Sequence, residues 1–574
     1  MSENNEKRKK ASGPFFFVPG ENNKFRFVDN GDGLNPRYVD RAELQSVIAA
    51  ENPAHNKLLH GFVTNYRDFK SAKRAVELRS FPVVVRNFSF KGRLPKCGGA
   101  VLMTGAAALR VRTKILKDMG EEEANHLLMA ESEAARSLGL STIPSISPEE
   151  FTAYAELPFV VECRNFYNYY HFTTESLIYL QMYRDFGMSG PIHFVTGGAG
   201  ELKPYIERAV EDFYPDLFDR IQFLTGSTSY KEAIIPFTTN HLYHFSTAAM
   251  LADIEEEAGF SNKLKNGDLR PATIDNYRNI FRNSRDEYIR LHRDAVLTRT
   301  FHDESAKLVY VSRKPGAARD RAIVGEDLLL EMLGRYGFKT VLFEEMTPIQ
   351  QASLVNSADV LISAHGAGFA NMLYGKPGAH FIELSHLQTA RHRFGDFNMH
   401  ASASGVFYTH FFADHSIGED DAVPNLHHEG HAGIALSQLA IDRLELMIVN
   451  LTDKESTKTF FTRVGALRKR QDHAAVISLI TSDRLRSSAC PNALTTLAET
   501  YVHAGDIPSA INTYVHLLKI VPYRADLWVA VAKLAAASGD DSAVAWAEAE
   551  AEVYKRARWM RWCRTETGAI SIMG

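Results

Sequence analysis

Short apolar runs alternate with helical segments through the middle of this 574-residue chain, and no other feature constrains the fold as strongly. Runs of this kind are typical of a parallel sheet that helices cover on both faces. We place a first α/β domain at 76–300, ending in a charged helical linker. Its strands are predicted at 81–87, 159–165, 192–198, 221–226 and 231–236, and its helices at 169–186 and 201–213.

A second series follows, and its short connections are typical of a doubly wound nucleotide-binding fold. We place this second α/β domain at 301–450 and expect the two domains to face each other across a cleft. Residues 410–431 have no helical period and are expected to form a long loop. The strands are predicted at 308–314, 340–345, 359–366 and 380–385, and the helices at 324–336, 348–357 and 368–374.

The two ends of the chain differ from this pattern. Residues 1–75 are polar and rich in turn formers, which predicts a partly ordered lead-in. Residues 457–574 are rich in Ala and Leu, and related dipeptides recur at a spacing of 34, namely Gln471–Asp472, Gly505–Asp506 and Gly539–Asp540. That period indicates tetratricopeptide-like helical hairpins, which we expect to dock a protein partner. A plain helical bundle is the alternative.

The composition excludes several classes of protein. Hydrophobic residues make up 45% and charged residues 23%, as in ordinary globular proteins, and a net charge of −4 without a long basic block argues against nucleic-acid binding. Four dispersed cysteines without a CxxC pair favour reduced thiols. We see no signal peptide or transmembrane segment and expect a cytoplasmic protein, with peripheral association at the inner membrane left open.

The stretch "LISAHGAGFANMLYGKPG" at 361–378 runs from an apolar strand through a histidine and a glycine turn into a helix. Glycines let a ligand approach the backbone closely, and the amides at a helix start attract phosphate. The sequence therefore predicts an anion site at this turn, although a purely structural strand-to-helix turn is the alternative. Its candidate residues are His365, Gly366, Ala367, Gly368 and Asn371.

Three more side chains should lie at the same edge of the second sheet. Arg313 and Arg321 follow its first strand, and ligands bind at the carboxyl ends of strands in open α/β sheets. Guanidinium groups suit a diphosphate, whereas the alternative is a solvated basic loop. Glu383 ends a later strand, where it would accept hydrogen bonds from ribose hydroxyls or simply face water.

These residues fit one family pattern. Ser312–Arg313 follows a strand, Arg321 lies in an RxI element with Glu326 downstream, and a helix begins near Gln350 or Gln351 before the HGAGxxN stretch. Together with "NYYHFTTESL" at 168–177, these motifs resemble glycosyltransferase family 61 over roughly residues 155–390. That family includes EGF-domain-specific N-acetylglucosaminyltransferases, plant xylan-decorating transferases and bacterial members. The chain departs from the family's usual residues at Phe172, Gly325, Phe369 and Ala370.

The resemblance implies an α/β fold of GT-B type, with two Rossmann-like domains and the nucleotide held by the second. It also implies an inverting transfer of a hexose or pentose from a nucleotide sugar to a saccharide or glycoconjugate acceptor, as in surface polysaccharide synthesis. His365 would touch the donor, and Asn371 would lock the helix start or reach the donor. Arg313 and Arg321 would stabilise the departing nucleotide. No cofactor is implied beyond the donor.

Inversion also needs a base for the acceptor hydroxyl. His171 and Glu175 lie four positions apart on a predicted helix, so they share a face, and a carboxylate that orients an imidazole suits this task. Two alternatives stay open: His171 only caps or packs the helix start, or Glu175 acts alone.

Metal dependence is undecided from the sequence. The acidic EDD at 419–421 resembles a metal motif but does not follow a buried strand, which favours an exposed loop. The histidines at 410, 415, 427, 428 and 431 lack an HExxH pattern or a cysteine partner, so we assign no metal ligands. Two other functions remain as alternatives, a nucleotide-sugar epimerase with the same two domains and a non-catalytic scaffold that acts through its repeats.

Overall fold

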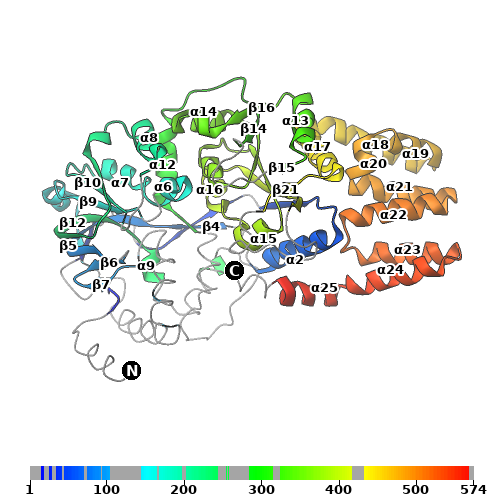
Figure 1. The fold of residues 1–574 in the computed structure, drawn as a ribbon, viewed down its shortest axis with the longest axis horizontal. Coiled ribbons are helices and arrows are strands. Elements are labelled where there is room, and N and C mark those ends of the chain that lie inside the picture. The colour runs from blue at the N-terminus through cyan, green and yellow to red at the C-terminus, as the bar shows by residue number, and fades with distance from the viewer. Residues whose placement is uncertain are drawn as a thin grey trace.

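The computed structural model of the chain has three parts along its long axis (Figure 1). We call them the first sheet unit, the second sheet unit and the helical arm, which comprises α18 to η7 (residues 454–567). The structure describes residues 15–17, 25–28, 34–41, 44–69, 74–91, 94–103, 115, 120, 144–163, 167–196, 202–243, 254, 256–257, 284–313, 323–416 and 432–567, and all structural statements refer to these.

The first sheet unit is built on a mixed sheet with the strand order β11-β10-β9-β12-β5-β1-β8. Strands β9 to β11 are parallel, as predicted, but the long strands β12 and β5 pair antiparallel. The prediction of a parallel sheet is therefore wrong for this half, because the path of the connections sets strand direction and an apolar run does not reveal it. The bounds are β1 Phe25–Val28, β5 Ser80–Lys91, β6 Leu94–Cys97, β7 Ala100–Val101, β8 Ser145–Ile146, β9 Phe159–Glu162, β10 Ile192–Val195, β11 Ile221–Leu224 and β12 Thr228–Thr238.

The helix predicted at 169–186 is interrupted. It forms α6 (Tyr169–Glu175) and α7 (Tyr179–Asp185), because the Ser176 hydroxyl donates to the carbonyl oxygen of Glu162 at 2.8 Å and its backbone leaves the helical conformation with φ of −130°. The break fixes α6 against the end of β9. The remaining helices near this sheet are α5 Pro148–Phe151, η3 Thr152–Tyr154, α8 Pro204–Phe213, η4 Phe218–Arg220, α9 Asn240–Tyr243 and α12 Glu287–Leu297.

The second sheet unit contains a six-stranded sheet, β16-β14-β17-β18-β19-β3, in which every neighbouring pair is parallel. Apolar residues of α13 and α17 cover one face, and those of α14, η6 and α16 cover the other. The bounds are β3 Gln45–Ile48, β14 Leu308–Ser312, α13 Glu326–Arg335, β16 Lys339–Leu342, η5 Phe343–Glu345, α14 Pro348–Ser357, β17 Val360–Ala364, η6 Ala367–Tyr374, β18 His380–Ser385, α15 Leu387–Arg393, α16 Asn398–Ser404, β19 Phe407–Phe412 and α17 Gln438–Thr452.

Two strands of this sheet come from regions where we expected none. Strand β3 and the helix α2 (Pro53–Phe69) belong to the predicted lead-in, yet β3 pairs with β19 and α2 packs beside it. Strand β19 in turn includes the first residues of the predicted loop at 410–431. β3 and α2 are an ordered part of the lead-in, whereas the loop prediction is wrong for the residues of β19, because the alternating pattern of FYTHFF is short and its partner strand lies far away in the sequence.

The strand order creates a switch point between β14 and β17. The chain leaves β14 toward β16 on one side, and then returns to β17 on the other side. In such sheets the connections diverge at this point and leave a crevice at the carboxyl ends of the two central strands, which is the usual ligand site. The crevice here is bounded by Arg313 after β14 and His365 after β17.

The two sheet units pack directly against each other, since residues of both belong to one hydrophobic cluster. Asp212 at the end of α8 accepts a hydrogen bond from the backbone N–H of Ile349 in α14, with a distance of 3.0 Å. His292 of α12 lies between the hydroxyls of Tyr214 and Tyr374, at 2.8 and 2.9 Å. Polar contacts therefore join the units within a packed interface.

The helical arm contains paired helices. The starts of α21 and α23, at Pro491 and Ala525, differ by the predicted period, and so do those of α22 and α24. Gly505 and Gly539 end the first helix of each pair at positive φ, of 79° and 72°, a conformation that favours glycine. The bounds are α18 Lys454–Lys469, α19 His473–Thr481, α20 Arg484–Ala489, α21 Pro491–Ala504, α22 Ile507–Ile520, α23 Ala525–Ala537, α24 Asp541–Val553, α25 Arg556–Trp562 and η7 Cys563–Thr567.

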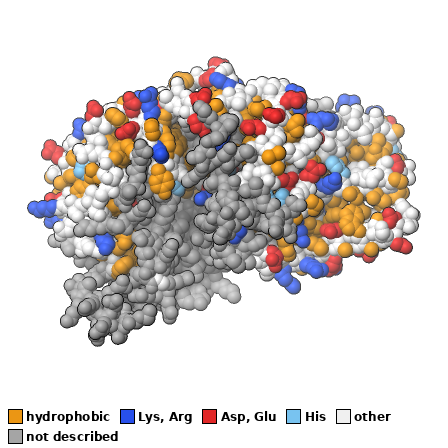
Figure 2. Space-filling view, in the orientation of Figure 1, with side chains coloured by type: hydrophobic (Ala, Val, Ile, Leu, Met, Phe, Trp, Pro, Cys, Tyr) orange, Lys and Arg blue, Asp and Glu red, His pale blue; other side chains and the backbone are white. Residues whose placement is uncertain are grey.

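Hydrophobic side chains show on the surface of the helical arm (Figure 2). The exposed large ones in the arm are Tyr523, Val529 and Trp546. A partner for the arm stays a prediction.

Two small sheets complete the described part, β13 (Ser284–Asp286) with β4 (Arg74–Leu78) and β2 (Arg37–Asp40), and β15 (Ile323–Val324) with β21 (Ile434–Ala435) and β20 (Asp414–His415). Within the described residues, none of the helices is both long and apolar enough to span a membrane.

Candidate active site

Arg313 and Gly366 meet at the switch point. A β-carbon on Gly366 would lie 1.7 Å from Nη2 of Arg313, so the guanidinium occupies the space that a side chain would need. The same Nη2 donates to the carbonyl oxygen of His365 at 2.8 Å. The residues from Gly366 to Gly368 are half-buried and thus reachable from outside. The turn and the guanidinium form one partly open, positively charged surface.

The helix that follows the turn is a 3-10 helix, η6, from Ala367 to Tyr374. The predicted helix at 368–374 is thus present, but in a tighter form, and it is buried from Phe369 onward. Gly368 packs on Phe343, since a β-carbon there would lie 3.1 Å from the ring. The three residues Gly366, Ala367 and Gly368 therefore present mainly backbone at the crevice.

A groove of about 870 Å³ adjoins Arg313 and is lined by residues of β14, α13, β16 and η5. Glu326, in the first turn of α13, lies in its wall and accepts hydrogen bonds from the hydroxyls of Ser312 at 2.9 Å and Tyr310 at 2.8 Å. The volume of the groove is large enough for a ligand the size of a drug molecule. Glu326 thus ties α13 to the end of β14 and presents its carboxylate beside the candidate anion site.

His365 is paired with Glu383 across the ends of β17 and β18. Its Nδ1 lies 2.9 Å from Oε1 of Glu383, and both side chains are buried. His410 and Tyr408 of β19 also face this carboxylate, with His410 Nδ1 3.3 Å from Oε1 and the Tyr408 hydroxyl donating to Oε2. Glu383 therefore lies in the middle of a buried polar cluster.

The position of Glu383 corrects the prediction that it binds ribose. The residue is 0% exposed, and both carboxylate oxygens face neighbouring side chains. Burial on its own raises the pKa of a carboxyl group, but the imidazoles of His410 and His365 outweigh it and hold the pKa of Glu383 well below its usual range. The carboxylate is therefore charged and acts on the protein's own side chains.

Asn371 connects the two sheet units. Its Oδ1 accepts a hydrogen bond from the Tyr169 hydroxyl of α6 at 2.9 Å, and its Nδ2 donates to Oε1 of Gln351 in α14 at 2.7 Å. Gln351 in turn donates to the carbonyl oxygens of Phe343 and Met346, next to the groove. Asn371 is 1% exposed, so its geometry fits the role of locking this region rather than that of reaching a ligand.

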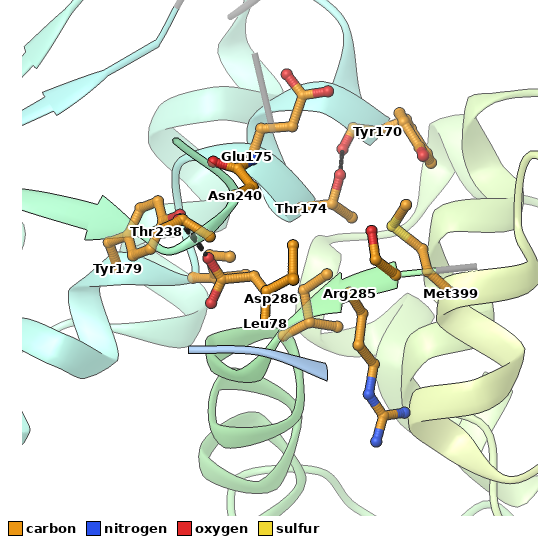
Figure 3. A pocket seen from close by; sticks show the side chains of 13 residues that line it. Leu78, Tyr170, Thr174, Glu175, Tyr179, Thr238, Asn240, Arg285, Asp286 and Met399 are labelled. Atoms are coloured by element: carbon orange, nitrogen blue, oxygen red, sulfur yellow. Dashed lines mark hydrogen bonds between the residues drawn. The ribbon is translucent and has the colours of Figure 1, made fainter. Parts of the chain in front are cut away.

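His171 and Glu175 form the expected pair on α6. Nδ1 of His171 lies 2.7 Å from Oε1 of Glu175, and the two side chains are 21% and 14% exposed. Glu175 also lines a cavity of about 120 Å³ between the units, with Thr238, Asn240 and Met399 among its walls (Figure 3). The pair therefore borders both the solvent and an interior cavity.

Aromatic contacts link this pair to the second histidine. Tyr170 lies next to His171, with ring centroids 5.0 Å apart, and it meets Phe397 at 5.6 Å. Phe397 also lies 5.5 Å from the ring of His365. The two histidine–carboxylate pairs thus border the same aromatic pair, Tyr170 and Phe397, on opposite sides of the interface.

Some predicted residues lie outside the described residues, among them Arg321, the acidic stretch 419–421 and the histidines at 427, 428 and 431. His410 and His415 are described, and both are buried in strands instead of lying in a loop. Within the described residues, no group of three or more His, Cys, Asp or Glu side chains is arranged to hold a metal ion.

Sequence reasoning missed Tyr408 and His410 as parts of the site. They occupy alternate positions of β19 and so point to the same face of the strand, where they meet Glu383. The alternation of FYTHFF would have revealed them if that segment had been interpreted as a strand. Tyr169 was quoted only within the NYYHFTTESL stretch at 168–177, and nothing in the sequence pointed to its contact with Asn371.

Comparison with known proteins agrees with this geometry. A family model described as Glycosyltransferase 61 matches residues 169–382, which include α6 and the strands up to β18. None of the curated proteins matches the chain. The departures noted above are mostly internal, since Phe172, Phe369 and Ala370 are buried, and Gly325 has a φ of 88° at the start of α13.

Proposed function

Because residues 169–382 belong to the glycosyltransferase 61 family, we propose that the protein is an inverting glycosyltransferase that uses a nucleotide-sugar donor and a saccharide or glycoconjugate acceptor. In this proposal the two sheet units form a GT-B pair. The second unit holds the donor, and the first supplies the acceptor side together with the base. Tetratricopeptide-like repeats in the helical arm would dock a partner protein.

One observation carries the proposal, the contact of Arg313 with the Gly366 turn at the switch point. A fixed guanidinium beside partly exposed backbone suits a diphosphate, because bidentate charged hydrogen bonds and backbone amides both favour phosphate oxygens. The groove beside Arg313 supplies room for the nucleoside, and Glu326 in its wall supplies an acceptor for hydroxyl groups. Arg321, in the segment that follows Arg313, is proposed as a second cation on the diphosphate.

The different solvent exposure of His171 and His365 indicates different roles for them. A base must pass its proton to solvent after each turnover, and His171 is 21% exposed whereas the His365 side chain is 9% exposed. His171, oriented by Glu175, would therefore take the proton of the acceptor hydroxyl. The acceptor oxygen forms a bond to the anomeric carbon, and the bond from that carbon to the diphosphate breaks with its electron pair going to the phosphate oxygen. Arg313 and His365 would stabilise this oxygen.

Calorimetry with nucleoside diphosphates tests the proposal. We expect the protein to bind one member of a panel of UDP, GDP, CDP, ADP and dTDP, and Arg313→Ala to weaken that binding about 10-fold or more, as the loss of a charged hydrogen-bond donor requires. Arg335→Ala is a matched control, because Arg335 pairs with Glu331 and Glu445 on the same domain, far along α13 from the crevice.

The corresponding nucleotide sugars, incubated with candidate acceptors, then separate transfer from other chemistry. Release of the diphosphate together with a new glycoside supports a transferase, whereas interconversion of the nucleotide sugar without an acceptor would indicate an epimerase. If the protein bound none of the five nucleoside diphosphates, this result would contradict the proposal and favour a scaffold without catalysis.

A further inference from the structure

The buried carboxylate of Glu383 contacts His365, which the proposed chemistry uses, and two residues of β19 that it does not use. His365 Nδ1 and His410 Nδ1 both face Oε1, and the Tyr408 hydroxyl donates to Oε2. The carboxylate is 0% exposed, so no water shell replaces these contacts. Moving an ionised carboxylate out of water is costly unless charged or hydrogen-bonding partners surround it. Because burying this carboxylate costs free energy, we expect the arrangement to have a function.

The hydrogen bonds fix the orientation of the cluster. The backbone N–H of Gly395 donates to Nε2 of His410 at 3.0 Å, so this nitrogen carries no proton. The proton of His410 then lies on Nδ1, which faces Glu383. On the other side, the Tyr408 hydroxyl can only donate to an ionised carboxylate. Two residues of β19 thus hold Glu383 in one position.

This arrangement also sets the tautomer and orientation of His365. Its Nδ1 donates to Glu383 at 2.9 Å, which sets the tautomer and directs Nε2 to the other side of the ring. A negative charge at this distance favours the charged form of the imidazole. The Arg313 guanidinium, which lies on the carbonyl oxygen of His365, acts in the opposite direction. Among the described residues, the carboxylate of Asp396 also acts electrostatically on Tyr408.

We propose that Glu383, held by Tyr408 and His410, is a positioning residue that keeps His365 as a charged donor toward the departing diphosphate. The inference rests on the proposed glycosyl transfer. When the bond between the anomeric carbon and the phosphate oxygen breaks, the electron pair stays on the oxygen, and Nε2–H of His365 donates to it. The proton of the acceptor leaves separately, to His171. Glu383 touches neither substrate and acts through His365 alone.

Glu383→Gln tests this role, because it keeps the shape of the side chain and removes its charge. We measure the affinity for the nucleoside diphosphate selected from the panel, between pH 7 and pH 8.5, where the charge of its phosphates is nearly constant since their last pKa is about 6. The variant should bind about 10-fold more weakly at pH 7, and the ratio to wild type should shrink as the pH rises, because deprotonation removes the charge of the imidazole in both proteins. A purely structural role would give the same ratio at both values.

Tyr408→Phe and Tyr336→Phe form a matched pair. Each removes one hydrogen bond from a tyrosine to a glutamate, since the Tyr336 hydroxyl donates to Glu445 at 3.0 Å in a part of the second unit away from the crevice. We expect Tyr408→Phe to lower the melting temperature more, because it removes a partner from a fully buried carboxylate, and we expect weaker binding of the nucleoside diphosphate only for Tyr408→Phe.

The outcomes separate the inference from the proposed function. If wild type binds a diphosphate and Arg313→Ala does not, while Glu383→Gln binds with a constant ratio to wild type across the pH range, the positioning role is wrong and the donor site stands. Equal binding by the two tyrosine variants also overturns it. If wild type binds none of the five diphosphates, the proposed function fails and the role of Glu383 fails with it.

Discussion

The guanidinium of Arg313 occupies the space beside Gly366 where a β-carbon would lie, only 1.7 Å from its Nη2. Gly366→Ala should therefore displace Arg313 without removing it. The backbone of Gly366 is extended, with φ of 170°, so alanine causes no backbone strain and the effect is confined to the contact. We expect binding of the nucleoside diphosphate to weaken about 10-fold or more, measured by calorimetry.

Gly334→Ala serves as the control for this substitution. Gly334 lies in the last turn of α13, and a β-carbon there would meet nothing within 4 Å. Alanine should leave binding unchanged and stabilise the helix by about 0.5–1 kcal/mol. Unchanged binding in Gly366→Ala would show that the position of Arg313 does not matter for the diphosphate.

Asn371→Leu tests the lock between the two sheet units. Leucine is similar in size, but it leaves the Tyr169 hydroxyl and Oε1 of Gln351 without the partner that they have in the structure. We expect a loss of about 2–4 kcal/mol in the free energy of unfolding, and Tyr169→Phe alone should cost about 1 kcal/mol. The double variant should lose less than the sum, because both changes remove the same hydrogen bond. Urea denaturation measures all three, and strict additivity would argue against the contact.

The stability of the interface should depend on pH through His292. Burial, reinforced by the nearby Arg184, lowers the pKa of His292 to about 3, whereas it is about 6.5 in the unfolded chain. The unfolded state therefore binds the extra proton first, and stability falls as the pH drops below about 6.5. His292→Gln keeps a donor and an acceptor for Tyr214 and Tyr374 but does not titrate.

The comparison of wild type with His292→Gln isolates this histidine, since His241 and His400, which are also buried, titrate in both proteins. Between pH 6 and pH 5 wild type should lose up to about 1.4 kcal/mol per pH unit more than the variant. Parallel stability curves from urea denaturation would mean that His292 binds its proton equally well in the folded state.

Gly61→Ala tests how the end of the helical arm docks. A β-carbon at Gly61 of α2 would lie 2.6 Å from the Trp562 ring and 2.7 Å from the Thr567 methyl group. Alanine should push η7 off α2, destabilise the protein by about 1–3 kcal/mol and raise hydrogen exchange in residues 556–567. Gly465→Ala in α18, where a β-carbon meets nothing within 4 Å, should not increase exchange there. Equal protection in both variants would contradict a close contact.

The sequence predicted local features of the fold well and long-range ones poorly. The helix at 348–357 and the strand at 380–385 occur where the pattern placed them, because capping residues and apolar runs mark their ends. The direction of β5 and the pairing of β3 with β19 depend on contacts far apart in the sequence. Nothing in a local window carries that information.

In the candidate site, too, local features could be predicted from the sequence and long-range ones could not. The pairing of His171 with Glu175 follows from helical spacing, and the structure has it at 2.7 Å. The surroundings of Glu383 could not be inferred, because the end of a strand predicts the edge of a sheet but not whether a neighbouring strand covers it. β19 covers Glu383, and we predicted no strand there, since its residues from His410 onward lay in the segment interpreted as a loop.

The pairing of β3 with β19 has a consequence for biosynthesis. The two strands meet through residues such as Gln45 and Thr409, which are 364 positions apart. At a translation rate of about 5–20 residues per second, β3 leaves the ribosome roughly 20–70 s before its neighbour exists. A nascent chain therefore carries a half-apolar strand with unpaired backbone groups for most of its synthesis, and a chaperone that shields it during this interval would raise the yield of folded protein.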